Sequence, residues 1–523
     1  MMSKSTRFLL SICSGLLLTF SFPYSGSQTY LIFIALIPVL FVEQEIRIKS
    51  YRPGKLFIHA YLTFLIYNVG TTWWIWNASQ GGAIMAFVLN SLLMAIAFFS
   101  YHLLLRKLGD SFGLLALISI WVGFEFLHFN WELSWPWLTF GNVFALQTDW
   151  VQWYSITGVL GGSIWVLTIN YLGFQILFTY LKTKQIAKTN ALLFIGCLAL
   201  PVILSNLISY TIEKKDSIRV ALLQPNIDPY LEKFNDPIEI QMDKMIALTK
   251  GLKQIDFYIA PETAIANQFY EPNWEQEISA LKLREHIQKT KGNWIIGAAT
   301  YEIFDTKKSR ASRKLPDGPG YIEFYNTALF MDTQFHTQIN HKSKLVLGVE
   351  KLPFSNIFPF IEELSIDNGG TSGTLGIEEE PNVMGNTTLF APVICYESIY
   401  GDFVRTQVKK GADFIAIITN DGWWGNTPGY RQHLALGALR AIENRRYVVR
   451  SANTGSSAII DPTGKICYKT NYWVPACISA TIFKQKGQTF YQHNGDYLGL
   501  FALYLSLGLA VVYALKRWKK SIK

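Results

Sequence analysis

The residue with the clearest chemical potential in this sequence is Cys395, which ends the apolar run Ala391–Ile394. A short apolar run that is rich in β-branched residues predicts a buried strand, and such a strand delivers its last side chain to a sheet edge. A thiol there is a nucleophile when a neighbouring group removes its proton, because the thiolate is the reactive form. The alternative is that Cys395 is a small buried apolar residue, as most free cysteines are. The rest of the sequence has to decide between these two interpretations.

Glu262 and Lys342 could supply the groups that a thiol nucleophile requires. Glu262 follows another strand-like run, Phe257–Pro261, and a carboxylate in a partly apolar pocket gains proton affinity and can act as a general base. Lys342 precedes a further apolar run, with Glu350 beyond it. An ammonium beside the thiol favours the thiolate and can hold the oxyanion of a tetrahedral intermediate. Each residue alone is more often a solvated surface group, so the hypothesis requires that the fold brings them together.

The segments around these residues predict an α/β domain. Short apolar runs of strand length alternate with mixed or amphipathic stretches, which is typical of this fold class. The glycine-rich run 369–373 lacks a Walker lysine and predicts a loop rather than a phosphate cradle. The predicted strands are 218–224, 257–261, 293–300, 326–331, 387–395, 414–419 and 447–452, with a hairpin-like segment at 456–460 and helices at 237–253, 274–290 and 429–446.

The rest of the chain is apolar enough to predict a membrane domain. Of the 523 residues, 50% are hydrophobic and 16% are charged, whereas about 25% are charged in soluble proteins. We therefore expect a seven-helix membrane domain over 1–215, the α/β domain over 216–486, and a membrane helix with a basic tail over 487–523. Segments that approach the ~20 residues needed to cross a bilayer lie at 8–22, 29–42, 56–76, 83–105, 112–129, 154–180, 191–210 and 497–515.

Basic residues predict the orientation of these segments. Lysine and arginine occur before the first segment, after the second, fourth and sixth, and at the C-terminus, whereas loops 23–28, 77–82 and 130–153 contain neither. Positively charged loops stay cytoplasmic, so both termini are expected in the cytoplasm and the α/β domain in the periplasm of a double-membraned bacterium. The net charge of +9 is then a topology signal, and no basic patch indicates a nucleic-acid partner.

Two features of the predicted membrane domain have open interpretations. Glu125 lies within the fifth apolar segment, and a carboxylate there is a functional-site hypothesis whose partner the sequence does not name. Loop 130–153 is rich in tryptophan and forms either an anchoring belt at the membrane interface or a rim for lipid access to a site. Its tryptophans are Trp131, Trp135, Trp137, Trp150 and Trp153.

The cysteines and histidines predict no disulfide framework, no metal and no cofactor. The five cysteines are few and scattered and include no CxxC pair. The eight histidines show no HExxH or other zinc spacing.

The order Glu262, Lys342, Cys395 resembles the nitrilase, or carbon–nitrogen hydrolase, superfamily, whose members use a Glu–Lys–Cys triad. The similarity continues through the segments 419–425, 439–446 and 450–455. A domain of this kind placed between seven apolar segments and one further segment resembles the apolipoprotein N-acyltransferase family over essentially the whole chain. The resemblance implies a multi-pass α-helical membrane bundle that carries a nitrilase-like αββα sandwich.

The resemblance also implies an acyl transfer. A phospholipid would donate an acyl chain to Cys395 as a thioester, and the α-amino group of the diacylglyceryl-modified N-terminal cysteine of an apolipoprotein would accept it as an amide. Glu262 would be the base and Lys342 the charge stabiliser. The remaining implied residues are Glu350 as a support near the substrate, Glu397 as the residue that orients Lys342, and Phe234, Tyr396 and Trp423 as candidate substrate-binding residues.

The chain departs from the family pattern at two places. The segment 345–350 lacks the Pro-Phe that often precedes the glutamate, and Phe234 stands where a tryptophan commonly follows a lysine. Two alternatives to the acyltransferase stay open at this point. One is a membrane-tethered amidase that uses the same triad on a small amide, and the other is a receptor or transporter that keeps the fold without the chemistry.

Overall fold

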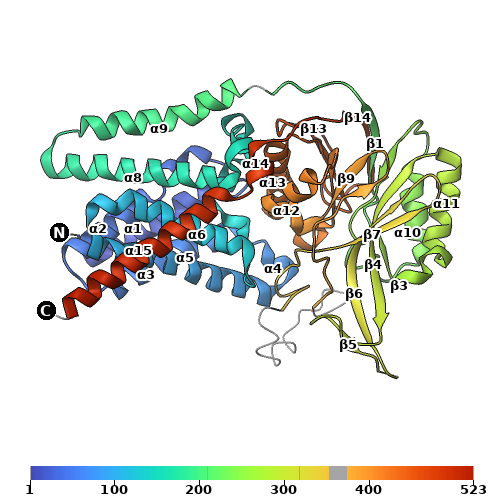
Figure 1. Cartoon of the computed structure of the whole chain (residues 1–523), viewed down its shortest axis with the longest axis horizontal. Coiled ribbons are helices and arrows are strands. Elements are labelled where there is room, and N and C mark those ends of the chain that lie inside the picture. The colour runs from blue at the N-terminus through green and yellow to red at the C-terminus, as the bar shows by residue number, and fades with distance from the viewer. Residues whose placement is uncertain (1, 209, 317, 353–373, 522–523) are drawn as a thin grey trace. The chain divides into compact units, whose positions relative to one another are not determined.

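The computed structural model describes residues 2–208, 210–316, 318–352 and 374–521 (Figure 1). The predicted glycine-rich loop at 369–373 lies outside these residues. The chain divides into two compact units. Unit 1 comprises Met1–Trp73, Ala83–Ser209 and Asn494–Lys523, and unit 2 comprises Trp74–Gly82 and Tyr210–His493.

Unit 1 is a bundle of apolar helices. Five helices of the described chain are long and apolar enough to cross a membrane, and they cover the predicted segments from 83–105 onward. Its longer helices are α1 (Lys4–Ser21), α2 (Ile37–Ile48), α3 (Gly54–Thr72), α5 (Gln80–Leu108), α6 (Gly113–Asn130), α8 (Val159–Thr183), α9 (Lys188–Leu207) and α15 (Tyr497–Ser521). Short helices connect them: η1 (Thr29–Phe33), η2 (Asp110–Phe112), η3 (Pro136–Leu138), η4 (Phe140–Leu146), η5 (Thr148–Trp150) and α7 (Tyr154–Thr157).

The prediction of one continuous helix at 29–42 is wrong. The chain forms the short 3-10 helix η1 and then begins α2 at Ile37, with Pro38 in its first turn. Proline favours the start of a helix because it lacks a backbone N–H and fixes φ. With 12 residues, α2 is about 18 Å long, which is short of the ~30 Å hydrocarbon core of a bilayer.

Buried polar and aromatic side chains hold the connections of unit 1. Glu125 Oε1 accepts hydrogen bonds from Trp121 Nε1 at 3.0 Å and from the Phe140 backbone N–H at 2.9 Å. The partner that the sequence could not name is therefore the backbone at the start of η4. Glu125 thus ties the middle of the tryptophan-rich loop 130–153 to α6.

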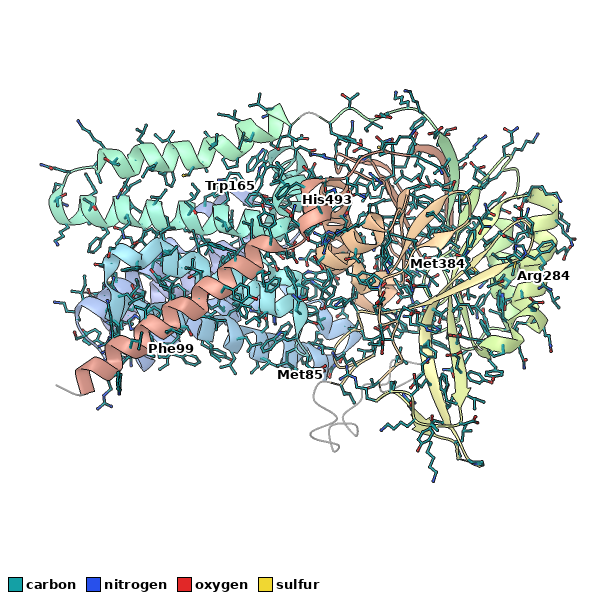
Figure 2. All side chains as sticks on the ribbon, viewed as in Figure 1. Met85, Phe99, Trp165, Arg284, Met384 and His493 are labelled. Atoms are coloured by element: carbon teal, nitrogen blue, oxygen red, sulfur yellow. The ribbon has the colours of Figure 1, made fainter. Side chains whose placement is uncertain are left out.

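The tryptophans of loop 130–153 divide into two groups. Trp137 and Trp153 are buried in unit 1, whereas Trp131 is 37% exposed. Trp153 packs against Trp165, which also contacts Phe33 and Phe144 (Figure 2). At least two of the five tryptophans are thus core residues of the helical unit, so an interface belt does not account for the whole cluster.

The described residues of unit 2 form two β-sheets. The larger has the order β14-β1-β2-β4-β6-β5, with β3 beside β4 and β7 beside β6, and the smaller has the order β13-β12-β11-β10-β9-β8. The strands of the larger sheet are β1 (Ser217–Gln224), β2 (Phe257–Ile259), β3 (Ile265–Tyr270), β4 (Asn293–Phe304), β5 (Arg313–Lys314), β6 (Tyr321–Met331), β7 (Thr337–His341) and β14 (Ala476–Phe483). Those of the smaller are β8 (Met384–Gly385), β9 (Leu389–Ile394), β10 (Phe414–Thr419), β11 (Val448–Ala452), β12 (Ala458–Ile460) and β13 (Ile466–Lys469).

Alternating side chains place the two sheets face to face with helices outside. Along β1, Val220 and Leu222 join the core between the sheets, whereas Ala221 and Leu223 join a second core with α10 and α11. This is the period of two that a strand imposes. Figure 2 labels Met384 in the core between the sheets and Arg284 on α11. The helices of unit 2 are α4 (Ile75–Ala78), η6 (Glu271–Gln276), α10 (Ile238–Ala247), α11 (Ile278–Thr290), η8 (Cys395–Ile399), α12 (Gly401–Lys409), η9 (Asp421–Trp424), α13 (Pro428–Asn444) and α14 (Phe490–Asn494).

Helix α13 lies on the outer face of the smaller sheet, where Gly437 faces Ile417 of β10 and Ile460 of β12. The layers are therefore helix, sheet, sheet and helix, and the predicted αββα sandwich is confirmed.

The expected strands all occur within a few residues of their predicted bounds. The sequence did not indicate β3, β5, β7, β8, β13 and β14 or the helix α12. The short runs among these elements resemble loops when they are considered without their pairing partners.

Gly297 on β4 lies against the backbone around Glu262, and only a residue without a Cβ fits at this distance. A Cβ at Gly297 would lie 2.5 Å from the Thr263 nitrogen and 2.6 Å from Glu262 Cα. We expect Gly297→Ala to lower the free energy of unfolding by about 1–3 kcal/mol, because backbone atoms cannot rotate out of the way. Thermal unfolding of the purified full chain in detergent checks this.

The matched control is Gly437→Ala on α13, where a Cβ would meet its nearest atoms at 3.6 and 3.7 Å. Alanine is favoured over glycine within a helix by about 1 kcal/mol, so this variant should be as stable as the wild type or more so. Equal melting temperatures for the two variants would contradict the close approach at Gly297.

Candidate active site

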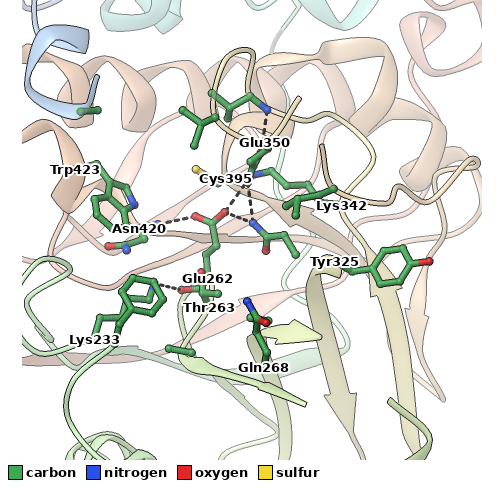
Figure 3. Close-up of a pocket in the computed structure, with 18 of the residues that line it drawn as sticks. Lys233, Glu262, Thr263, Gln268, Tyr325, Lys342, Glu350, Cys395, Asn420 and Trp423 are labelled. Atoms are coloured by element: carbon green, nitrogen blue, oxygen red, sulfur yellow. Dashed lines mark hydrogen bonds and ion pairs between the residues drawn. The ribbon is translucent and has the colours of Figure 1, made fainter. Parts of the chain in front are cut away.

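The three residues singled out for chemistry line one pocket (Figure 3). Glu262 lies in the turn after β2, Lys342 directly follows β7, and Cys395 directly follows β9. Strands β2 and β7 belong to the larger sheet and β9 to the smaller one. The pocket therefore lies where strand ends of the two sheets meet. Its wall is completed by Ala78, Lys233, Phe234, Thr263, Ala266, Gln268, Ala299, Tyr325, Asn326, Val346, Val349, Glu350, Leu375, Asn420, Trp423 and Trp424.

Two sharp turns present the acid and the thiol to this pocket. Cys395 has φ of +53° and Thr263, directly after Glu262, has φ of +47°. A side chain in the left-handed region costs on the order of 1–3 kcal/mol and persists only where its surroundings impose it. At Cys395 the turn converts the buried strand β9 into η8. It leaves the thiol at the strand end, with only 9% of the residue exposed.

Lys342 is held by two carboxylates. Its Nζ donates to Glu262 Oε1 at 3.1 Å and to Glu350 Oε1 at 2.8 Å. Asn326 Nδ2 donates to the same two oxygens at 2.8 and 3.1 Å. Burial lowers the pKa of Lys342, but the charges of Glu262 and Glu350 outweigh it and hold the pKa above its ordinary value. Lys342 is therefore a permanent ammonium, with one of its three N–H donors left for another acceptor.

Glu262 is an ionised carboxylate in this arrangement. Besides Lys342 and Asn326, it accepts the Asn420 backbone N–H on Oε2 at 3.0 Å. Burial raises its pKa, but the charge of Lys342, the hydrogen bond from Asn326 and the charge of Lys233 together hold the pKa below the ordinary value. A buried, ionised carboxylate that lines the same pocket as a thiol is equipped to accept its proton.

The thiol of Cys395 is protonated in this environment. Burial raises its pKa above the ordinary value, the charge of Glu262 raises it further, and the opposing effect of Lys342 is smaller. The predicted effect of Lys342, which favours the thiolate, is therefore present but smaller than the effects that oppose it. For this thiol to act as a nucleophile, a base would have to take its proton during attack.

Glu397 joins the turn of Cys395 to the turn of Lys342. Its Oε2 accepts the Ile394 backbone N–H at 2.8 Å, and its Oε1 accepts those of Ser343 at 2.6 Å and Lys344 at 3.2 Å. The sequence-based hypothesis had Glu397 orient Lys342. The hydrogen bonds place it on the backbone that follows Lys342 rather than on the ammonium. Burial raises the pKa of Glu397 to about 7, and the hydrogen bonds from Ile394 and Ser343 oppose that rise.

A buried charged network lies behind Cys395. His433 Nε2 lies 3.1 Å from the Cys395 carbonyl oxygen and 2.8 Å from Ser398 Oγ, and its Nδ1 lies 3.0 Å from Asp421 Oδ1. Arg450 Nη2 donates to Asp421 Oδ2. Burial raises the pKa of Asp421, but Arg450 and His433 outweigh it and hold the pKa at about 2. The network fixes the carbonyl of the strained residue from the side away from the pocket.

The candidate substrate-binding residues do not all reach the pocket. Phe234 and Trp423 line it, and Phe234 is 39% exposed. Tyr396 is not among the lining residues, since it is buried with its ring 5.4 Å from that of Tyr400. Because Cys395 turns in the left-handed region, the next side chain points into the domain. The selection of Tyr396 as a substrate contact is therefore not supported.

Sequence reasoning missed three residues of the site: Lys233, Asn326 and Asn420. Lys233 precedes Phe234, so the departure noted at Phe234 already marked this position. Asn326 lies within a predicted strand and Asn420 directly after one, but an amide at a strand end carries no signal of its own. Over the described part of the chain, no group of three or more His, Cys, Asp or Glu side chains forms a possible metal site.

Comparison with known proteins assigns the class of unit 2 and then the family. Residues 219–490 match the carbon–nitrogen hydrolase family, and residues 14–172 match the apolipoprotein N-acyltransferase N-terminal domain. The apolipoprotein N-acyltransferase of Chlorobaculum tepidum is 30% identical over 98% of this chain and 97% of its own length. That of Geobacter metallireducens is 26% identical over 98% of this chain and 96% of its own length.

Among solved structures, a CN-hydrolase superfamily protein of Xanthomonas campestris matches with 17% identity and a TM-score of 0.36. This match covers 51% of this chain and 90% of that one. The sequence matches establish the relationship: the chain belongs to the apolipoprotein N-acyltransferase family. It is thus an acyltransferase, and its apolar helices agree with a bacterial membrane protein.

Asp421→Asn tests the network behind Cys395. The change leaves the buried guanidinium of Arg450 without its carboxylate, and breaking a buried pair in this way costs about 3–5 kcal/mol. The pKa of Asp421 is about 2 against 3.8 ordinarily, so its stabilisation is present above pH 4 and is lost as the pH falls toward 2. Thermal unfolding at pH 7 should show a large loss for the variant, and the difference from the wild type should shrink in acid.

The control is Asp243→Asn, because Asp243 pairs with Lys282 at the surface with its side chain 65% exposed. An exposed pair contributes about 1 kcal/mol or less. If the two variants lose the same stability at pH 7, Asp421 is not part of a buried charged network.

Proposed function

We propose that the chain transfers an acyl chain from a phospholipid to an apolipoprotein, through a thioester on Cys395. The acceptor is the α-amino group of a diacylglyceryl-modified N-terminal cysteine. The observation that carries the proposal is the shared pocket of Glu262, Lys342 and Cys395 in a member of the apolipoprotein N-acyltransferase family. Two sets of contacts support it. Lys342 donates hydrogen bonds to two carboxylates, and Glu397 accepts the backbone N–H that precedes the turn at Cys395.

The first half-reaction acylates the enzyme. Glu262 takes the thiol proton as the sulfur of Cys395 attacks the ester carbonyl carbon of the phospholipid. The remaining N–H donor of Lys342 stabilises the oxyanion of the tetrahedral intermediate. When the intermediate collapses, the C–O ester bond breaks and the proton on Glu262 passes to the departing alkoxide. The products are a thioester on Cys395 and a lysophospholipid.

The second half-reaction discharges the thioester. The neutral α-amino group of the acceptor attacks the thioester carbonyl, and Glu262 takes a proton from the attacking nitrogen. The C–S bond then breaks, and the proton on Glu262 returns to the sulfur, so that the thiol and an amide are formed. Because burial and Glu262 both favour the thiol form, the enzyme returns to the state from which it started.

The proposal also includes the location of the catalytic domain relative to the membrane. Residues 1–215 and 487–523 form the membrane domain, and residues 216–486 form the catalytic domain on the periplasmic side of the inner membrane, with both termini cytoplasmic. The support is the absence of Lys and Arg from alternate loops of the sequence. A periplasmic site has access to the amino termini of lipoproteins on that side.

Acylation in the absence of acceptor tests the mechanism. Full-length protein with a phospholipid that carries a labelled acyl chain should form a hydroxylamine-sensitive adduct on Cys395, seen by mass spectrometry. A diacylated lipopeptide with a free amino terminus should then discharge the label to an N-acyl product. Cys395→Ser should form no thioester, and Glu262→Gln should lower the acylation rate by at least ~100-fold because the thiol proton loses its acceptor.

Cys467→Ser is the matched control, because Cys467 is an exposed thiol of the same unit and should acylate at the wild-type rate. Label on Cys467 instead of Cys395 would identify a different nucleophile. Prompt release of the label as free fatty acid, with or without lipopeptide, would replace the transferase with an amidase-type hydrolase.

Reporter fusions test the orientation. We expect cytoplasmic signals from fusions near Lys188 and at Lys523 and a periplasmic signal from a reporter within 270–320. A cytoplasmic signal from this reporter would reverse the topology and remove the lipoprotein amino terminus as the acceptor.

A further inference from the structure

Lys233 is a buried lysine that the acyl-transfer steps do not use. It lies between β1 and α10, where its backbone N–H donates to Asp228 O at 2.9 Å and its carbonyl accepts from Gln241 Nε2 at 3.0 Å. The residue is 3% exposed and lines the pocket of Cys395. Lys233 and Lys342 approach Glu262 from opposite sides (Figure 3). The backbone is thus fixed, and the side chain extends into the active site.

The ammonium of Lys233 differs from that of Lys342 in its partners. Lys342 is within 4.0 Å of two carboxylates, whereas no ion pair of the described residues includes Lys233. The one hydrogen bond of its Nζ goes to the Glu262 backbone carbonyl at 3.5 Å, and the Phe234 ring centroid lies 5.9 Å away. A buried cation without an anion is costly. Consistent with this, burial lowers the pKa of Lys233 to about 8, although Glu262 and Cys395 oppose that shift.

An unpaired buried cation on a pocket wall predicts an anionic group on the ligand. Of the two substrates in the proposed reaction, the acceptor brings an amino group, which is a cation before it reacts. The donor brings a phosphodiester, which is an anion at every physiological pH. The phosphate and the ester carbonyl groups of a phospholipid are carried by one glycerol. A phosphate can therefore reach a second group on the wall while a carbonyl lies at Cys395.

We propose that the Lys233 ammonium binds the phosphate group of the phospholipid donor and so selects phosphate-bearing lipids as acyl donors. This inference rests on the proposed function. Lys233 is then a donor-binding residue, and Lys342 remains the residue that faces the oxyanion. The two lysines differ in their partners, because two carboxylates form ion pairs with Lys342, whereas no described carboxylate lies within ion-pair distance of Lys233.

The test compares two acyl donors with the same acyl chains, a phosphatidylethanolamine and a phosphate-free 1,2-diacylglycerol. Acylation of Cys395 is measured at increasing donor concentration in mixed micelles with full-length protein. In Lys233→Met, the phosphatidylethanolamine concentration for half-maximal acylation should rise at least about tenfold. This is the loss of affinity expected when one charge-assisted hydrogen bond is removed. The diacylglycerol concentration for half-maximal acylation should be unchanged, whereas any effect of the lost charge on Glu262 should alter the maximal rate with both donors alike. Lys233→Arg keeps a phosphate-binding cation and should restore most of the phospholipid dependence.

Lys308→Met is the matched control, since Lys308 is a lysine near aromatic rings of the same unit but outside this pocket. An equal rise of the half-maximal concentration with both donors in Lys233→Met would mean that Lys233 does not recognise the phosphate, and would overturn the proposal. An unchanged phospholipid dependence would overturn it as well. If the wild type forms no adduct on Cys395 from either donor, the proposed function itself fails, which is a different result.

Inorganic phosphate separates the lipid headgroup from free phosphate as the ligand. At the ionic strength of a sodium chloride control, sodium phosphate should inhibit the wild type and Lys233→Met to the same small extent. A strong inhibition confined to the wild type, with no difference between the two donors, would assign Lys233 to free phosphate and overturn the lipid assignment.

Discussion

Two carboxylates share one buried ammonium at the centre of unit 2, and the rest of the site depends on that arrangement. Without Lys342, the Glu262 and Glu350 side chains would be like charges bridged only by Asn326. Without the carboxylates, Lys342 would be an uncompensated buried cation, a state that costs several kcal/mol. The pairing therefore fixes the turn after β2, the end of β7 and the segment before Glu350 relative to one another. It also keeps Glu262 ionised, which is the property that a base requires.

Glu397 extends this constraint from one sheet to the other. Its carboxylate accepts backbone N–H groups at Ile394 in the smaller sheet and at Ser343 and Lys344 beyond the larger one. A carboxylate that accepts several backbone hydrogen bonds gives more geometric control than a single ion pair, because each bond fixes a direction. The left-handed turn at Cys395 is held from this side by Glu397 and from the other by His433 and Ser398. The position of the thiol is thus determined by the backbone rather than by a rotamer.

Glu262 and Cys395 can be predicted from the sequence because each follows an apolar run that forms a strand. Lys342 was selected from its place before an apolar run and from the family resemblance, since the antiparallel strand β7 that ends just before it was not indicated by the sequence. Lys233 and the pairing of His433 with Asp421 cannot be predicted, since they depend on which turns approach after folding. The sequence predicts that an ammonium favours the thiolate of Cys395, but it does not show that burial and the charge of Glu262 outweigh that effect. Tyr396 was misplaced because a single left-handed residue reverses the side on which its neighbour lies.

The raised pKa of the Cys395 thiol also affects how readily this thiol is oxidised. Oxidation to sulfenic acid and exchange with disulfides both begin from a thiolate. A buried thiol beside an ionised carboxylate presents little of that form to a passing peroxide or disulfide. In the proposed mechanism, the thiolate of Cys395 forms only while an acyl donor occupies the pocket and the proton moves to Glu262. A sulfur that stays in the thiol form between turnovers offers less of the species from which oxidation begins.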